Sequence, residues 1–316
     1  MDMLLARALA PKTQVIYRRA WDRLQDFQTR RGLPVGLPVA SSTLALFVTS
    51  MDLAGYAAPT VATSLSAISF IHKLAGFPDP ADTFLLRKLR DGIARNAPSR
   101  EPRRAMTLEL LNEMVAYLSQ SRRADANLYS AIFSLAFHLC ARIGELVVSN
   151  GSTHHALRVD QVSILKKNET PVSLQVTFRS YKHKQDKGQV VRLVSATKGQ
   201  ACPVGLLVRY LSGRRRCRQD DYLFVTPSGR PVQAQDVRIL LRSTLTALGR
   251  DPTKYSTHSF RVGGATTAAQ QGASDAQLRM LGRWSSSAFL SYVRPRAFSF
   301  NYKRPALQPP PPHLMQ

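Results

Sequence analysis

The chain has 316 residues, 44% of them hydrophobic, which is long and apolar enough for two domains with their own cores. Its 44 Lys and Arg residues outnumber its 20 Asp and Glu residues, and the net charge of +24 predicts a polyanionic partner, because self-repulsion on this scale opposes a compact state. An acidic membrane is the alternative partner, but no apolar run approaches the roughly 20 residues of a spanning helix, so nucleic acid is the first candidate.

The N-terminal residues 1–95 are predicted to form about four helices. Apolar and aromatic residues recur at helical spacing over Tyr17–Phe27 and Val61–Ala75, and the stretch DTFLLRKLRDGIARN opens on Asp82 as a capping residue. Segments with Pro and Gly, such as GLPVGLPVASS and GFPDPAD, separate these helices. The following residues 96–105 (NAPSREPRRA) are basic, contain two prolines and have no apolar period, which predicts an interdomain linker.

The rest of the chain combines helices with a small sheet. Residues 106–147 keep a helical period, and the stretches DQVSILKK, SLQVTFRSYK and GQVVRLV then show strand character, with KHKQDKG as a hairpin loop between the last two. From residue 203 to about residue 292 the pattern is helical apart from DYLFVTPSGRPV, and the Pro-rich residues 298–316 predict an extended or disordered tail. The predicted fold is mainly α with a small antiparallel β-sheet.

Neither secretion nor metal binding is indicated. The start MDMLLARALAPK is too short and too weakly apolar for a signal peptide, so we expect an intracellular protein. Cys140, Cys202 and Cys217 are widely spaced and form neither a disulfide pattern nor a metal-ligand cluster, and Cys140 is expected in the core.

Two pairs of polar residues stand three positions apart in apolar surroundings. Arg142 and Glu145 lie in HLCARIGELV, predicted as an apolar helix, where an unpaired charge would be costly. His258 and Arg261 lie in THSFRVGGATT, and residues three apart are neighbours on a helix surface. The second pair could therefore reach a single small anionic group.

Two more segments carry candidate residues. In LGRWSSSAFLSYV, Gly282 is expected to end a helix, Trp284 to lie in the turn, and Tyr292 to follow eight residues later. The predicted hairpin SYKHKQDKG carries Lys182 at its tip, with Lys184 in the same loop.

In chain order these residues resemble the active-site set of the tyrosine recombinases, the phage-integrase class. The ARIGEL box, a lysine on a β-hairpin, HSFR, LGRW and a terminal tyrosine follow the order of that family. GRWSSSAFLSYVR looks most like the eukaryotic branch found in DIRS-type retrotransposons and Crypton elements, where Trp often replaces the second histidine of the family. The gap from Trp284 to Tyr292 is one residue shorter than in many bacterial members. The set consists of Arg142, Lys182, His258, Arg261, Trp284 and Tyr292, with Glu145 behind it.

The resemblance implies an architecture and an activity. Residues 1–95 would be an all-α core-binding domain and residues 106–297 a mixed α/β catalytic domain, the two forming a clamp around double-stranded DNA. The enzyme would cut and rejoin DNA at specific sites through a 3′-phosphotyrosyl intermediate, for integration or excision of a mobile element. It would act as a homotetramer on paired sites, in the nucleus if the host is eukaryotic, and without a metal, cofactor or small-molecule substrate.

The chemistry of such a reaction explains the residue types. A covalent intermediate keeps the energy of the phosphodiester bond, and in-line attack builds negative charge on oxygens that two arginine forks can hold. By resemblance Tyr292 is the nucleophile, Arg142 and Arg261 hold the phosphate, and Lys182 protonates the departing 5′ oxygen. His258 transfers a proton or donates to the phosphate, Trp284 donates its indole N–H and packs on the tyrosine segment, and Glu145 orients the site.

Each residue alone has a simpler interpretation. Arg142 and Glu145 could form an ordinary helix ion pair, His258 could be a semi-buried histidine, Trp284 a core anchor and Tyr292 one of ten tyrosines. The other lysines of the loop, Lys184 and Lys187, compete with Lys182, and Tyr255 and Tyr302 are rival nucleophiles on the wrong side of the motifs or beyond them. The alternative functions are a catalytically silent DNA-binding protein derived from a recombinase and a type IB topoisomerase-like enzyme.

Overall fold

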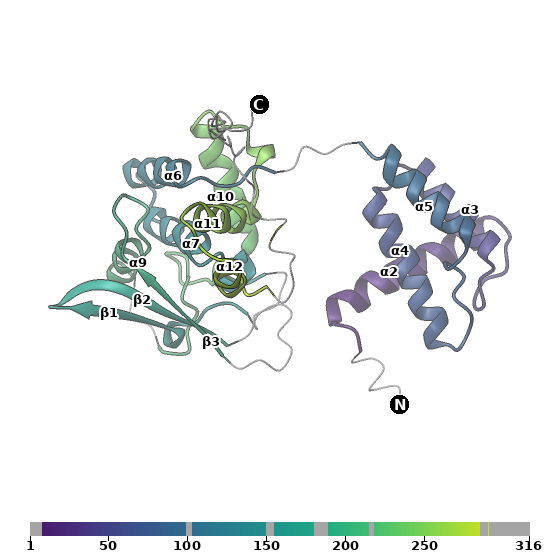
Figure 1. Ribbon diagram of the computed structural model, residues 1–316, viewed down its shortest axis with the longest axis horizontal. Coiled ribbons are helices and arrows are strands. Elements are labelled where there is room, and N and C mark those ends of the chain that lie inside the picture. The colour runs from purple at the N-terminus through teal and green to yellow at the C-terminus, as the bar shows by residue number, and fades with distance from the viewer. Residues whose placement is uncertain are drawn as a thin grey trace, which may run out of the picture. The chain divides into compact units, whose positions relative to one another are not determined.

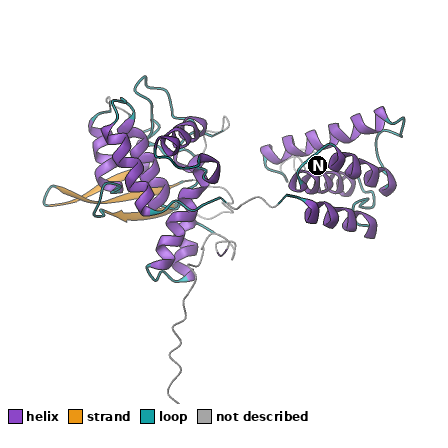
Figure 2. Cartoon of the chain, turned by 90° about the horizontal axis from the view of Figure 1, so that it is seen from above, coloured by secondary structure: helices purple, strands orange, loops and turns teal. Residues whose placement is uncertain are grey.

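The chain is divided into two compact units. A computed structural model describes residues 8–98, 103–149, 155–179, 189–214, 218–284 and 290. The units are Met1–Arg100 and Glu101–Gln316, and the division falls within the segment 96–105 expected as a linker. The first unit is helical and the second combines helices with a three-stranded antiparallel sheet (Figures 1 and 2), which confirms the predicted fold class. Within these ranges no helix is long and apolar enough to cross a membrane.

Four helices make up the described part of the first unit, as the apolar period predicts. Two of them begin with a proline in the first turn, where its missing N–H and fixed φ are tolerated. Leu24, Phe47 and Ile68, from three different helices, belong to one shared core. The helices are α2 (Pro11–Arg30), α3 (Ser41–Leu53), α4 (Ala58–Leu74) and α5 (Phe84–Asn96).

The predicted cap of α5 is wrong by one residue. The N-cap is Thr83, whose hydroxyl accepts a hydrogen bond from the backbone N–H of Leu86 at 3.3 Å. Asp82 instead forms an exposed ion pair with Arg87 at 3.3 Å. Thr and Asp are both good N-caps, so two adjacent candidates cannot be separated without the backbone geometry.

The second unit is built around α7. Nearly every residue of this helix is buried, from Ala126 to Phe137, because α6, α9 and α11 all pack against it (Figure 1). Ala and Ser at several of these positions let the neighbouring helices approach closely. The helices are α6 (Leu108–Gln120), α7 (Ala126–His138), α8 (Ile143–Leu146), α9 (Pro203–Ser212), α10 (Ala234–Ala247), α11 (Thr257–Gln270) and α12 (Asp275–Gly282), with 3-10 turns η1 (Val159–Gln161) and η2 (Pro252–Lys254).

The strands of the sheet are β1 (Val162–Lys167), β2 (Thr170–Phe178) and β3 (Val190–Ser195). They lie in chain order, and each pairs antiparallel with the next. Leu174 and Phe178 are fully buried on one face of β2, as the strand alternation predicts. The expected hairpin loop between β2 and β3 lies outside the described residues.

Two adjacent glycines let α11 approach its neighbours more closely than any side chain would allow. A Cβ atom built on Gly263 would lie 1.8 Å from the backbone oxygen of Met106, and one on Gly264 would lie 2.1 Å from that of Phe137. The segment that contains Met106 is also bonded to α11, since Met106 N–H donates to the carbonyl of Ser259 at 2.9 Å. The VGG sequence therefore fixes the position of α11 against α7 and the start of the second unit.

We expect Gly263→Ala to destabilise the second unit by about 1–3 kcal/mol, because overpacking forces the backbone of Met106 to move. Gly205→Ala is the matched control. Gly205 also lies in a helix, and the nearest atom to an added Cβ is the Cys202 sulfur at an ordinary 3.8 Å. Chemical denaturation of the two variants measures the difference. Equal stabilities would show that α11 can move without cost.

Candidate active site

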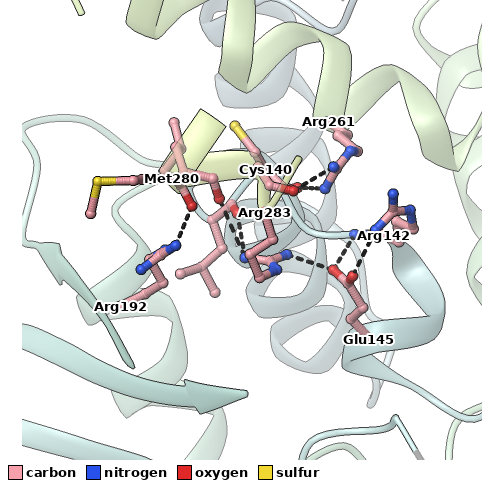
Figure 3. A network of polar contacts seen from close by, with 10 residues as sticks. Cys140, Arg142, Glu145, Arg192, Arg261, Met280 and Arg283 are labelled. Carbon is pink, nitrogen blue, oxygen red and sulfur yellow. Dashed lines mark hydrogen bonds and ion pairs between the residues drawn. The ribbon is translucent and has the colours of Figure 1, made fainter. Parts of the chain in front are cut away.

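Arg142 lies just outside a helix, which corrects the prediction that it shares one with Glu145. Helix α7 ends at His138, and Cys140, buried as expected, takes a left-handed conformation with φ of 45° before Arg142 caps the short helix α8. Such a conformation costs a non-glycine residue about 1–3 kcal/mol and persists where the surroundings fix it. Here the turn points the carbonyl of Cys140 at Arg261, whose Nη1 donates to it at 2.5 Å (Figure 3).

The carboxylate of Glu145 is shared by two arginines (Figure 3). Its Oε2 accepts from the backbone N–H of Arg142 at 2.8 Å, and its Oε1 accepts from Nη1 of Arg142 at 3.1 Å. Oε2 also pairs with Nη2 of Arg283 at 2.5 Å. Burial alone would raise the pKa of Glu145, but the charge of Arg283 and the contacts with Arg142 outweigh it and lower this pKa. Glu145 is therefore ionised at neutral pH.

Arg261 is fully buried on α11. Besides its bond to Cys140, it donates from Nη2 to the carbonyl of Gly282 at 2.5 Å, and the ring of Trp284 lies 4.3 Å from its guanidinium carbon. Burial, followed by the charge of Arg142, lowers the pKa of Arg261 to about 10. The group stays protonated at neutral pH. The side chain of Arg142 is 26% exposed, so an anion from solvent meets Arg142 first.

His258 lies in the first turn of the same helix. Ser256 caps this helix and accepts from the backbone N–H of His258 at 3.2 Å. Burial lowers the pKa of His258, and the charges of Arg261, Arg142 and Arg103 lower it further. The imidazole is therefore neutral at neutral pH in the absence of a bound anion. Arg103, in the segment before α6, is a further cation near the site, outside the sequence motifs.

The end of α12 brings three successive residues to the site. Helix α12 ends at Gly282, as predicted, and the next residue, Arg283, has the left-handed φ of 56° and ψ of 43°. Trp284 then folds back over Gly282, where an added Cβ would lie 1.9 Å from the indole ring. The glycine is required for this close approach, and it places Trp284 beside Arg261.

Arg283 is the largest omission of the sequence interpretation. Its side chain is only 1% exposed, and its guanidinium lies 4.1 Å from the ring centre of Phe178 at the end of β2. It also donates to the carbonyls of Leu281 at 3.3 Å and Leu139 at 3.5 Å. The sequence signal for Arg283 is its place directly after Gly282, which ends the helix. A left-handed residue at a helix end is usually glycine or asparagine, so an arginine there is unusual.

The hairpin strands are also joined to α12. Arg192 on β3 donates to the carbonyl of Met280 near the end of α12 (Figure 3), and Phe178 on β2 contacts Arg283. The structure thus brings together Arg142, Glu145, His258, Arg261 and Trp284 of the predicted set. Lys182 and Tyr292 lie outside the described residues.

The site carries more positive than negative charge. Within the described part of the chain, Arg142 and Arg283 pair with one carboxylate, that of Glu145, and Arg261 adds a third positive charge that acts on it. A buried excess of positive charge is costly, and a phosphate group would offset it. The geometry therefore suits the binding of a single anionic group next to Arg142 and His258.

Comparison with known proteins identifies the family. Residues 106–295 match the model of the phage integrase family, and because they are more than half of the chain, the chain belongs to this family. In a search of curated proteins, no protein matched.

Solved structures with a similar fold include integrases and recombinases. The Tn1549 transposon integrase in complex with transposon right-end DNA has a TM-score of 0.62 at 16% identity, over 92% of this chain and 91% of that chain. A lambda integrase dimer bound to a COC′ core site has a TM-score of 0.60 at 15% identity, over 95% of this chain and 76% of that chain. The XerH site-specific recombinase bound to difH substrate has a TM-score of 0.55 at 14% identity, over 78% of this chain and 65% of that chain. At these identities the likeness shows a common fold.

We expect the pKa of His258 to rise when a phosphodiester binds, because the added negative charge offsets the cations that lower it. NMR titration of the imidazole signals with and without a DNA duplex measures this shift. His72 is the internal control, since its ring nitrogens contact Val39 N–H and the Ile68 carbonyl in the core of the first unit. A His258 pKa that stays the same or falls on DNA binding would contradict an anion site here.

Proposed function

We propose that the protein is a site-specific DNA recombinase that cuts and rejoins DNA strands through a covalent bond between Tyr292 and the 3′ phosphate. Membership of the phage integrase family supports this proposal. The observation that carries it is the convergence of Arg142, from the α7–α8 turn, and Arg261, from α11, near one ionised carboxylate, with His258 close enough for both charges to lower its pKa.

The two arginines and the histidine have distinct roles in the proposed reaction. Arg142, partly exposed and fixed by Glu145, binds a non-bridging oxygen of the scissile phosphate, and Arg261 stabilises the charge that develops there as the nucleophile attacks in line. These fixed cations supply the charge that many phosphoryl-transfer enzymes take from metal ions. His258, neutral before DNA binds, is able to take a proton from the attacking hydroxyl or to donate to the phosphate.

Tyr292 and Lys182 complete the reaction in this proposal. Attack by the Tyr292 phenolic oxygen forms the P–O bond to tyrosine and breaks the bond to the 5′ oxygen, which Lys182 protonates as it leaves. The reverse sequence rejoins the strand, so no external energy source is needed. Trp284, whose ring lies 4.3 Å from the guanidinium carbon of Arg261, is the indole N–H donor in this proposal.

The assembly and origin follow from the family resemblance. We infer that the two units form a clamp around duplex DNA and that four copies pair two sites. The likeness of GRWSSSAFLSYVR to DIRS and Crypton elements favours a mobile element of a eukaryotic host, hence integration or excision in the nucleus. Fold relatives include a transposon integrase solved with transposon end DNA, which is consistent with such a role.

Tyr292→Phe should abolish covalent attachment to DNA and leave binding nearly unchanged, because the phenolic oxygen contributes little to an interface dominated by phosphate contacts. The substrate is a DNA site selected from a random library by binding, and the readout is a denaturant-stable protein–DNA adduct. Tyr302→Phe is the control and should keep the adduct. An adduct in the Tyr292 variant would overturn the assignment.

The same assay separates the alternatives. A wild-type chain that binds its selected site without forming an adduct would be a catalytically silent DNA-binding protein. Relaxation of supercoiled DNA by the monomer, without exchange between paired sites, would indicate the topoisomerase-like enzyme.

Lys182→Ala should cleave ordinary DNA slowly but a 5′-bridging phosphorothioate at close to the wild-type rate, because a sulfur leaving group departs without a proton. Arg142→Ala should stay slow on both substrates, since it removes charge stabilisation. Single-turnover cleavage rates measure the ratio. Lys184→Ala and Lys187→Ala are the controls, and rescue by sulfur of Lys184→Ala instead would move the general acid to that residue.

A further inference from the structure

Arg283 has no role in the reaction as proposed above, although it is the most buried partner of Glu145. Its side chain is 1% exposed and that of Glu145 3%, and Nη2 of the one lies 2.5 Å from Oε2 of the other. We propose that Arg283 is a positioning residue for strand cleavage: it neutralises Glu145, so that Glu145 holds Arg142 in place without cancelling the charge of Arg142. The inference rests on the proposed function.

The two carboxylate oxygens of Glu145 contact different groups. Oε1 accepts only from Nη1 of Arg142 among the contacts described, whereas Oε2 accepts from the backbone N–H of Arg142 and pairs with Arg283. The pair with Arg283 is the shorter and the more buried of the two ion pairs. The backbone bond fixes the position of Arg142, whose side chain is the more exposed of the two arginines.

Charge balance explains why a second arginine is needed. If Glu145 had Arg142 as its only ion-pair partner, the two would form a nearly neutral pair and attract a phosphate weakly. With Arg283 present, the group of Arg142, Arg261, Arg283 and Glu145 keeps two positive charges in excess. Buried ion pairs are costly to break, because the remaining partner is left uncompensated.

Other contacts fix Arg283 itself. The guanidinium stacks on Phe178 at 4.1 Å and donates to the carbonyl of Leu139, so it joins the ends of β2, α7 and α12. Its backbone is left-handed, and the chain leaves α12 from this residue toward Trp284. These contacts, with the bond to the carbonyl of Leu281, hold the Arg283 side chain in place independently of Glu145.

The first experiment does not depend on catalysis. In the wild-type chain the carboxyl faces Arg283, Arg142 and Arg261, and its pKa lies below its unfolded value, so its ionised form stabilises the fold above that value. In Arg283→Met the charge that most strongly opposes the effect of burial is lost, so the pKa of Glu145 rises relative to the wild type. The loss of thermal stability caused by Arg283→Met should therefore grow as the pH rises from about 4 to 7. The same substitution in a Glu145→Gln background should show no such pH dependence.

A surface pair of the same unit is the matched control. Arg250 and Glu113 form an ion pair at 3.1 Å in which both side chains are about half exposed. Arg250→Met should have a small effect on stability with little change over the same pH range, because exposed pairs are weak. A stability loss for Arg283→Met that is constant with pH, or that persists unchanged in the Glu145→Gln background, would overturn the proposal.

The second experiment tests the effect on the reaction. Arg283→Met should lower the single-turnover cleavage rate by about a hundredfold, as a small displacement of a catalytic group does. DNA affinity should change little, because the scissile phosphate is one of many phosphates that the protein contacts. Arg283→Lys should recover most of the rate and the wild-type pH behaviour of stability. A folded Arg283→Met variant that cleaves like wild type would contradict the positioning role. A wild-type chain that does not cleave would overturn the proposed function, and the pH experiment would still decide whether Arg283 holds Glu145 ionised.

Discussion

The buried carboxylate of Glu145, placed between two arginines, is the interaction on which the arrangement of the site depends. An ionised group this deep in the protein is stable only when opposite charges and hydrogen-bond donors surround it. Its partners come from the turn after α7 and from the end of α12, which are far apart in the sequence. Pairing them brings the end of α12, Arg142 and the strands β2 and β3 to one place.

The convergence needs close packing and local strain. Gly263 and Gly264 bring α11 against α7, which places Arg261 within reach of the carbonyl of Cys140. Cys140 and Arg283 both take left-handed backbone conformations, which are unfavourable for residues other than glycine. Strain of this kind at residues surrounding a site is kept where the geometry serves a function. Both turns point polar groups inward: the carbonyl of Cys140 toward Arg261, and the guanidinium of Arg283 toward Glu145.

The sequence predicted the elements well and the connections between them poorly. Helical and strand periods located the four N-terminal helices, the sheet and α11, because each depends on local apolar spacing. The break between α7 and α8 was missed, since a left-handed cysteine carries no sequence signal, and the role of Arg283 depends on three partners distant in the chain. The tyrosine and the hairpin lysine were assigned from motif order, and they remain predictions.

A structure of the chain on its selected DNA site, with orthovanadate in place of the scissile phosphate, tests the central claim most directly. We expect Arg142 and Arg261 to contact the vanadate oxygens, with the Tyr292 oxygen in line and Glu145 still paired with Arg283. Vanadate held by other side chains, or a Glu145 carboxylate turned away from Arg283 toward Arg142 alone, would contradict a site organised around this shared carboxylate.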